Sequence, residues 1–335
     1  MTERKKYSFK DYVNKVLAGT ASAIVIGLIA NAILGGIFGY LSSYASIFGT
    51  LETVVSTMQF LTPVLVGVLA AMQFNLNPME SVIVGAASFL GSGAYAVTEE
   101  GIKLVGIGDL VNVMLIAGLA IFAVRALQGK LGSLTLILLP ILVGAGIGTI
   151  GLITLPYVSL VTSSIGNIIN SFTQLQPLMM ALLISIAFSV IIVSPISTVA
   201  IGIAIGITAA TAVLVVGSRK VNESGTTLAI LLGAMKMMMP NLVRHPRIVI
   251  PIITNAIFSG LGAYLFTIQG IPKTAGFGIV GLVGPIQAFN MGANIISVLV
   301  SYFVIPFVGA FIIDYVLNNL LNVYDSEIFK FVPAE

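Results

Sequence analysis

The sequence predicts an all-α integral membrane protein, a polytopic bundle of about ten transmembrane helices. Its 335 residues are 58% hydrophobic and 8% charged, with a mean hydropathy of +1.10, so charge is too scarce to cover a water-soluble globule. Long stretches such as 131–156 have no polar face. The 35 glycines suit transmembrane helices, whose backbones approach closely where side chains are small. We therefore expect lipid to surround the chain.

A helix needs about 20 apolar residues to cross the hydrocarbon layer. Candidate segments lie at 18–42, 55–75, 79–97, 104–128, 131–156, 176–193, 195–217, 226–240, 247–268, 274–292 and 294–321. Segments 104–128 and 274–292 are rich in glycine and contain Asp109 and Pro285, so either is a candidate for a broken or re-entrant helix. Segment 157–175 has apolar residues at helical spacing among Ser, Thr and Asn. It fits an interfacial helix or a cavity-lining span.

Two halves of the chain resemble each other, which predicts an internal duplication. Asn77-Pro78, followed by GAYAVTEEGIK, aligns with His245-Pro246, followed by GAYLFTIQGIPK. LPILVGAGIG at Leu139 aligns in the same order with IPFVGAFIID at Ile305. The predicted organisation is a cytoplasmic amphipathic segment (1–17), a first repeat (18–156), a connector (157–193), a second repeat (194–325) and a C-terminal tail (326–335).

Basic residues near short loops remain in the cytoplasm, so they predict the orientation. Arg4, Lys5, Lys6, Lys10 and Lys15 place the N-terminus inside. Arg219 and Lys220 fall inside if 157–175 spans the membrane, which makes the repeats inverted, and outside if it lies flat, which makes them parallel. We favour inverted repeats, at the cost that Arg244, His245 and Arg247 then fall outside or at a re-entrant tip. Transporters built from inverted repeats hold their solute near the membrane midplane.

Several classes of function are excluded by what the sequence lacks. It has no cysteine, no zinc-ligand spacing, no Walker motif and no nucleophile elbow, so we expect no metal, no cofactor and no catalytic site in this chain. The net charge of +3 comes mostly from loops and tails, and no basic helix suited to a nucleic-acid groove is present. The expected partners are lipid and a small solute.

Polar residues in apolar segments are the candidate site residues, because lipid penalises them unless they face a cavity or a partner. Asn77 and Glu80 form a helix-capping pattern, and the same helix N-terminus can direct its free N–H groups at a bound solute. His245, the single histidine, lies between two arginines and is either a solute ligand or an interfacial loop residue. Thr98 and Glu99 are sugar-hydroxyl ligands or simply solvated.

The suspected broken segments and the last segment supply the remaining candidates. Gln287 and Asn290 can line a cavity or join helices by hydrogen bonds. Asp109 and Asp314 are candidates for ion or proton coupling, and Asp314 can instead pair with a basic group. Lys236, among four methionines, is interpreted as a side chain that extends toward the membrane surface.

Four stretches, in the order NPMESVIVGAASFLGSGAYAV, SPISTVAIGIAIGI, PNLVRHPRIVIPIITNAIFSGLGAY and GIVGLVGPIQAFN, resemble the enzyme IIC type 2 membrane proteins of the bacterial sugar phosphotransferase system, the group that includes perfringolysin-regulator-like proteins. The resemblance implies a homodimeric permease in the bacterial plasma membrane, with phosphoryl transfer supplied by separate IIA and IIB proteins. In better-known members a His and a Glu contact the sugar. By residue type alone, His245 and Glu80 or Glu99 would fill those roles.

The expected function is therefore an enzyme IIC-like permease that moves a small polar solute, a sugar or sugar derivative, by alternating access. The chain carries no IIB domain and no cysteine to be phosphorylated. Two alternatives therefore stay open. One is an ion-coupled or uncoupled secondary transporter of a non-sugar solute, and the other is a membrane sensor or regulator that binds a ligand without moving it.

Overall fold

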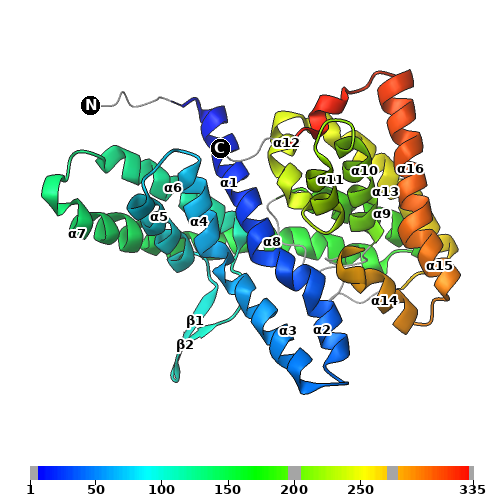
Figure 1. Cartoon of the computed structure of the whole chain (residues 1–335), viewed down its shortest axis with the longest axis horizontal. Coiled ribbons are helices and arrows are strands. Elements are labelled where there is room, and N and C mark those ends of the chain that lie inside the picture. The colour runs from blue at the N-terminus through cyan, green and yellow to red at the C-terminus, as the bar shows by residue number, and fades with distance from the viewer. Residues whose placement is uncertain (1–6, 195–204, 270–277, 332–335) are drawn as a thin grey trace. The chain divides into compact units, whose positions relative to one another are not determined.

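A computed structural model describes residues 7–194, 205–269 and 278–331. These residues are mostly helical, and their contacts form two compact units that are described separately (Figure 1). Unit 1 contains residues 7–27 and 59–159, and unit 2 contains residues 28–58 and the described part of 160–331. The first residues of the predicted N-terminal segment, the stretch 195–204, Lys273 and the end of the predicted tail lie outside the described residues.

Apolar helices confirm a multi-pass membrane protein. Within the described ranges, six helical runs are long and apolar enough to cross a membrane. They are Phe9–Leu41, Ser46–Met72, Leu110–Leu127, Gly132–Gln174, Pro246–Leu265 and Ile295–Leu320. Three shorter apolar helices are α5 (Pro78–Leu90), α9 (Pro177–Ile191) and α10 (Ile205–Ser218). The predicted total of about ten spans stays a prediction.

Close helix packing in unit 1 depends on glycine. The unit contains the first part of α1 (Phe9–Ala30), α4 (Thr62–Met72), α5, α6 (Leu110–Leu127), α7 (Thr135–Leu139) and the first part of α8 (Gly146–Ser171). A Cβ on Gly19 of α1 would collide with the backbone of Ala70 on α4, so only glycine permits this approach. Val16 and Leu17 are already buried, and α1 continues through residue 17 without a break. Residues 9–17 of the N-terminal segment predicted at 1–17 are therefore not separate from the first long helix but form its start.

A β-hairpin interrupts the helices of unit 1, and the sequence analysis missed it. Strands β1 (Tyr95–Thr98) and β2 (Gly101–Leu104) pair antiparallel, and Figure 1 shows them extending away from α4 and α5. Asp109 then caps α6, which runs unbroken. The break proposed for 104–128 is thus absent from its helical part: Gly106 and Gly108 lie in the loop before Asp109, and Gly118 lies within the unbroken helix.

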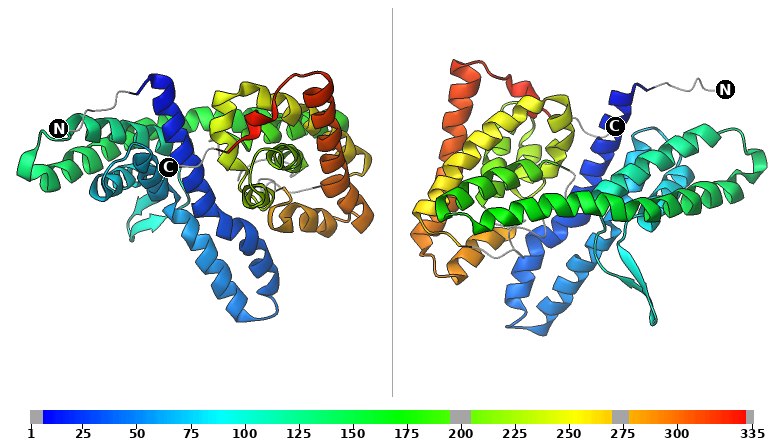
Figure 2. Two further views of the ribbon diagram at one scale, coloured as in Figure 1. Left: turned by 45° about the horizontal axis from the view of Figure 1, so that its top comes forward. Right: turned by 180° about the vertical axis from the view of Figure 1, so that it is seen from behind.

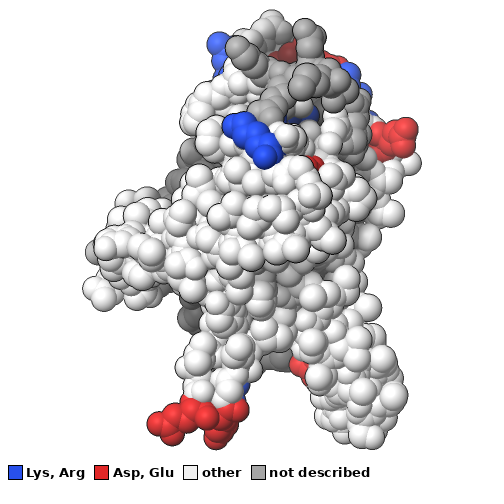
Figure 3. Space-filling model, turned by 90° about the vertical axis from the view of Figure 1, so that its left-hand side faces the viewer, with Lys and Arg blue, Asp and Glu red and all other residues white. Residues whose placement is uncertain are grey.

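Charge separates the two ends of unit 1. At one end the Lys15 ammonium donates to the Gln73 carbonyl oxygen at 2.7 Å, and the Arg125 guanidinium lies 4.6 Å from the centre of the Tyr7 ring. The hairpin lies at the other end of α6, about 27 Å away at 1.5 Å per residue. Figure 3 shows acidic side chains at the hairpin tip and a wide uncharged surface beside it, as lipid contact requires.

Unit 2 is built around α9, α10 and α13 (Val249–Leu265), which lie side by side in Figures 1 and 2. The Ser185 hydroxyl of α9 donates to the Ala256 carbonyl of α13 at 2.8 Å, and a Cβ on Gly260 would lie 2.9 Å from the Ala181 carbonyl oxygen. As numbers rise along α9 they fall along α13, so the two helices are antiparallel. The remaining elements of unit 2 include α3 (Ser46–Met58), α11 (Ser224–Leu231), α12 (Met239–Arg244), α14 (Val283–Asn290), α15 (Ile295–Leu299), the π-helical turn η10 (Val300–Val304) and α16 (Ile305–Asp314).

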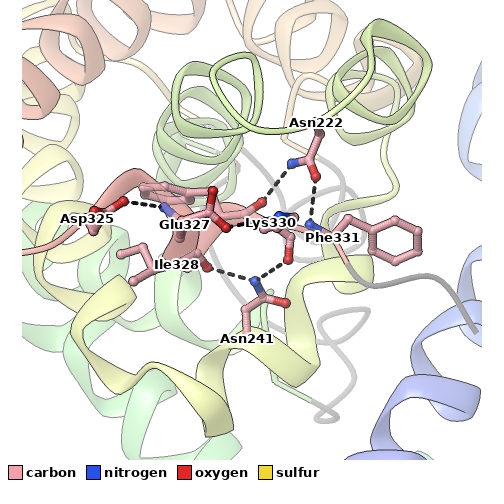
Figure 4. Close-up of polar contacts among 8 residues, drawn as sticks. Asn222, Asn241, Asp325, Glu327, Ile328, Lys330 and Phe331 are labelled. Carbon is pink, nitrogen blue, oxygen red and sulfur yellow. Dashed lines mark hydrogen bonds and ion pairs between the residues drawn. The ribbon is translucent and has the colours of Figure 1, made fainter.

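A C-terminal strap, residues 325–331, crosses one end of unit 2 (Figure 4). The Asn222 amide donates to the Phe329 carbonyl at 2.7 Å and accepts from the Phe331 N–H at 2.7 Å. The Asn241 amide donates to the carbonyls of Ile328 and Lys330, at 2.7 and 2.9 Å. On the strap side these four bonds involve only backbone atoms; the bond to the Ile328 carbonyl is buried and the other three are partly buried.

The strap shows that α11 and α12 form a re-entrant turn. The two helices meet at a bend of 118° near Gly233, whose φ of 128° is open mainly to glycine. Asn222 precedes α11 and Asn241 lies on α12, yet both bind carbonyls of adjacent strap residues, which are only about 4 Å apart. The pair therefore starts and ends at one side of unit 2. Segment 226–240 is a re-entrant turn and not the predicted span.

The sequence repeats coincide with different local structures. The first GAY copy opens the hairpin at Tyr95, whereas the second lies in the last turns of α13, at Gly262 to Tyr264. In the second matched pair, the π-helical turn Pro140–Ala145 lies inside the first copy, whereas the π-helical turn Val300–Val304 ends just before the second copy begins at Ile305. The duplication stays a prediction.

Candidate functional site

A pocket of about 420 Å³ lies in unit 2, within the size range of small-molecule sites. It is bounded by the C-terminal end of α13, the first half of α9 and the start of α10. The lining residues are Pro177, Met180, Ala181, Ser185, Ile205, Gly206, Ala263, Tyr264, Thr267, Ile268 and Gln269. Gly206 allows α10 to approach here, since a Cβ would collide with the Ser185 carbonyl.

The chain turn after α13 builds one wall of the pocket. The Ile268 N–H bonds to the Ala263 carbonyl at 2.9 Å and the Thr267 N–H to the Tyr264 carbonyl at 3.1 Å, which ends the helix. Thr267 then adopts a left-handed conformation, with φ of 50°. This conformation is strained for a β-branched residue, and such strain concentrates at functional sites. The turn brings Thr267 and Gln269 to the pocket.

The pocket offers hydrogen bonds without charge. Among the described residues that line it, none is charged, and the polar side chains are Ser185, Tyr264, Thr267 and Gln269. Ser185 is 3% exposed and donates to α13, so its oxygen keeps acceptor capacity. The other lining side chains are apolar. Hydroxyl and amide groups around an apolar wall suit an uncharged solute that carries hydroxyl groups and hydrocarbon faces.

The predicted site residues of unit 1 lie far from each other. Asn77 and Glu80 form a capping box, with bonds of 2.9 and 3.1 Å, and the Gln128 amide donates to both Glu80 carboxylate oxygens at 3.0 Å. Thr98 and Glu99 lie at the hairpin, at the opposite end of the unit, where the Thr98 hydroxyl donates within the turn. The two pairs do not line one chamber. A solute-binding role for each pair stays a prediction.

The predicted site residues of unit 2 lie at different distances from the pocket. His245 is exposed between α12 and α13, about 30 Å along the twenty-residue span from the pocket end. Gln287 is half-buried and Asn290 exposed on α14, whose Ala288 belongs to the same buried cluster as Ile205, Ala263 and Ile268 of the pocket wall. Gln287 and Asn290 thus lie on a helix that packs beside the pocket.

The two candidate coupling residues have local partners. Asp109 accepts bonds from the backbone N–H groups of Val111 and Asn112, at 3.0 and 3.1 Å. Asp314 is 8% exposed and pairs with the Lys220 ammonium at 2.6 Å, and it accepts a weaker bond from Tyr324 at 3.4 Å. Burial and the Asp314 carboxylate raise the pKa of Tyr324. Asp314 thus pairs with a basic group, one of its two predicted roles.

Lys236 differs from its sequence interpretation. Its side chain is 7% exposed and donates to the Ser194 carbonyl at 2.6 Å, so it points into unit 2 and not toward the membrane surface. The re-entrant turn explains the difference, because it places Lys236 inside unit 2, next to Ser194. The pocket residues themselves were missed as a group, although the second GAY copy marks Tyr264, Thr267 and Gln269.

Comparison with known proteins identifies the family. The family described as "Phosphotransferase system, EIIC" matches residues 14–331, nearly the whole chain. No curated protein and no solved structure matches. The matched range covers both units and the pocket, together with the apolar helices. The chain is thus a multi-pass membrane protein of the permease type and belongs to the phosphotransferase system EIIC family.

Proposed function

We propose that this protein takes up a small uncharged hydroxylated solute, a sugar or sugar derivative, and that the unit 2 pocket is its outer binding site. The observation that carries the proposal is that the described residues lining the pocket offer polar but uncharged side chains, at the end of an apolar span. A phosphorylated or carboxylated solute would need a cation there, since burying an unpaired charge is costly. An uncharged polyol needs only hydroxyl and amide partners.

Charge distribution supports the orientation of the pocket. Lys220 follows α10, while Arg244 and Arg247 precede α13, and Arg247 donates to the Val323 carbonyl beside the strap at 3.4 Å. The re-entrant turn brings these residues to one end of unit 2, opposite the pocket. The positive-inside rule assigns this end to the cytoplasm, so the pocket opens outward. It also assigns the Lys15 and Arg125 end of unit 1 to the cytoplasm, in line with a cytoplasmic N-terminus.

The family supports further parts of the proposal. Transport proceeds by alternating access in the bacterial plasma membrane, between inverted repeats, in a homodimer served by separate IIA and IIB proteins. IIA and IIB would supply the phosphoryl transfer, as family membership suggests, since the sequence contains no cysteine to be phosphorylated.

Uptake by proteoliposomes tests the proposal. A panel of radiolabelled neutral sugars and polyols is compared with phosphorylated and carboxylated solutes, with and without IIA and IIB. The expected result is uptake of one neutral solute, lost in Gln269→Ala and reduced in Tyr264→Phe. Uptake of anionic solutes alone would overturn the proposal, and binding without uptake would make the protein a sensor.

The same assay tests the residues predicted from sequence. His245→Ala, Glu80→Gln and Asn290→Ala are measured in folded protein. If all three retain wild-type binding and uptake while Gln269→Ala does not, the site is confined to the pocket. Loss in His245→Ala would extend the solute path to the basic end.

A second candidate function, ion-coupled transport, is favoured by the pair between Lys220 and Asp314. Asp314 lies within the apolar run Ile295–Leu320, and ionisable residues in such segments often serve proton or ion coupling. Uptake that depends on an imposed proton or sodium gradient, and loses this dependence in Asp314→Asn, would support it.

A further inference from the structure

Buried oxygen atoms without partners continue from the pocket along α13. Ala263 of the pocket wall, Ser259 and Asn255 are four residues apart and therefore occupy one face of the helix. Ser259 and Asn255 are each 0% exposed. Within the described residues, neither the Ser259 hydroxyl nor the Asn255 amide oxygen has a hydrogen-bond partner. Such atoms destabilise a fold, so two on consecutive turns beside a pocket need an explanation.

Asn112 in unit 1 shows what a satisfied asparagine looks like in this chain. Its amide donates to the Gly91 and Gly151 carbonyls at 2.7 and 3.0 Å, and its oxygen accepts from the Thr154 hydroxyl at 2.8 Å. Asn255 makes the same two donations, to the Ala209 and Pro306 carbonyls at 2.9 and 3.0 Å. It lacks only the hydroxyl donor, and a hydroxyl group of a solute can supply that bond.

The neighbouring helix leaves room for the Asn255 oxygen. A Cβ on Gly309 of α16 would lie 2.5 Å from it, so glycine lets the Asn255 oxygen lie this close to α16. The π-helical turn η10 packs against α10 and α13 and carries Ser301, which is 0% exposed and whose hydroxyl has no partner in the described part of the chain. π-Helical turns often occur at functional sites.

We infer that Ser259 and Asn255 form an inner binding position for the hydroxyl groups of the solute, on its route from the pocket toward the basic end of unit 2. This inference rests on the proposed function. On the following turns Ile252 and Ile248 are buried, 0% and 1% exposed, and belong to the main apolar cluster of the unit. These two isoleucines would close the inner side of the route, so the solute would reach the inner position from the pocket.

Cysteine accessibility tests the route, because the natural chain contains no cysteine. Ser259→Cys is compared with Ser88→Cys, since Ser88 on α5 is also 0% exposed and has no hydrogen-bond partner among the described residues, but lies in unit 1. Each variant in proteoliposomes is treated with a small hydrophilic methanethiosulfonate. We expect Ser259→Cys to react and Ser88→Cys to stay unmodified, while both react after unfolding in SDS. If Ser259→Cys is as unreactive as Ser88→Cys, the inference is wrong.

Ser259→Ala tests the solute contact itself. Losing one hydrogen bond should reduce the uptake rate about 2- to 10-fold. Equilibrium binding in the pocket should stay unchanged, and the melting temperature should rise, because an unpaired buried hydroxyl is gone. Wild-type uptake in Ser259→Ala would overturn the inner position and leave the proposed function intact. A wild-type protein that binds no neutral solute would overturn the proposed function.

Discussion

Thr267 offers a substitution whose effects on stability and binding should have opposite signs. The left-handed conformation costs an L-residue roughly 1–2 kcal/mol, and glycine escapes that cost. Glycine also gives the unfolded chain about 0.4–1 kcal/mol of extra conformational freedom. Thr267→Gly should therefore stabilise the protein by about 0.5–1 kcal/mol. Because the variant removes a pocket hydroxyl, solute affinity should fall about 2- to 10-fold.

Two control variants separate these effects. Thr267→Ala loses the hydroxyl but keeps the strained backbone, so it should lose affinity without gaining stability. Asn322→Gly changes a residue at φ of 49° outside the pocket, and since asparagine tolerates this conformation, stability and affinity should both change little. Chemical unfolding in detergent measures the stability of each variant, and equilibrium binding measures its solute affinity. Unchanged affinity in Thr267→Gly, or a loss of stability, would refute the reasoning.

The remaining predictions concern structure around the site. Asn77→Ala removes a helix cap and should lower the free energy of unfolding by about 1 kcal/mol, measured by chemical unfolding. Lys220→Met should lower the free energy of unfolding by about 1–3 kcal/mol, since it leaves the mostly buried Asp314 carboxylate without its cation. Adding Asp314→Leu should restore most of that loss. Equal stability of the single and double variants would contradict this. Asn222→Ala releases the strap, so lysyl endopeptidase should cleave after Lys330 several-fold faster than in wild type.

Much of the fold could be predicted because hydrophobic length is a local property. Segment 247–268 matches the span Pro246–Leu265 closely, and the capping box at Asn77 was visible in its spacing. The hairpin was missed because its strands are short and lie between two apolar segments. The bend at Gly233 could not be told from the many other glycines, since the residue that would collide with a side chain there, Val280, is distant in the sequence.

The pocket was harder to predict because it arises from contacts between distant segments. Gly206 and Ser185 meet across two helices, and no local pattern reveals their proximity. The sequence-based candidates included both charged residues and uncharged ones such as Asn290, but not Gln269, which lines the pocket. Charged residues such as Glu80 instead take part in helix caps and local polar pairs. A buried charge is costly unless nearby groups form hydrogen bonds with it.

Solute protection of one engineered thiol tests the central claim most directly. Gln269→Cys puts the single cysteine of the chain at the exposed rim of the pocket. Its modification rate by a hydrophilic thiol reagent is measured in proteoliposomes while the neutral solute identified by uptake is titrated. The account predicts that the rate falls as the solute saturates, with half-protection near the transport half-saturation concentration. A rate that stays constant at saturating solute would contradict it.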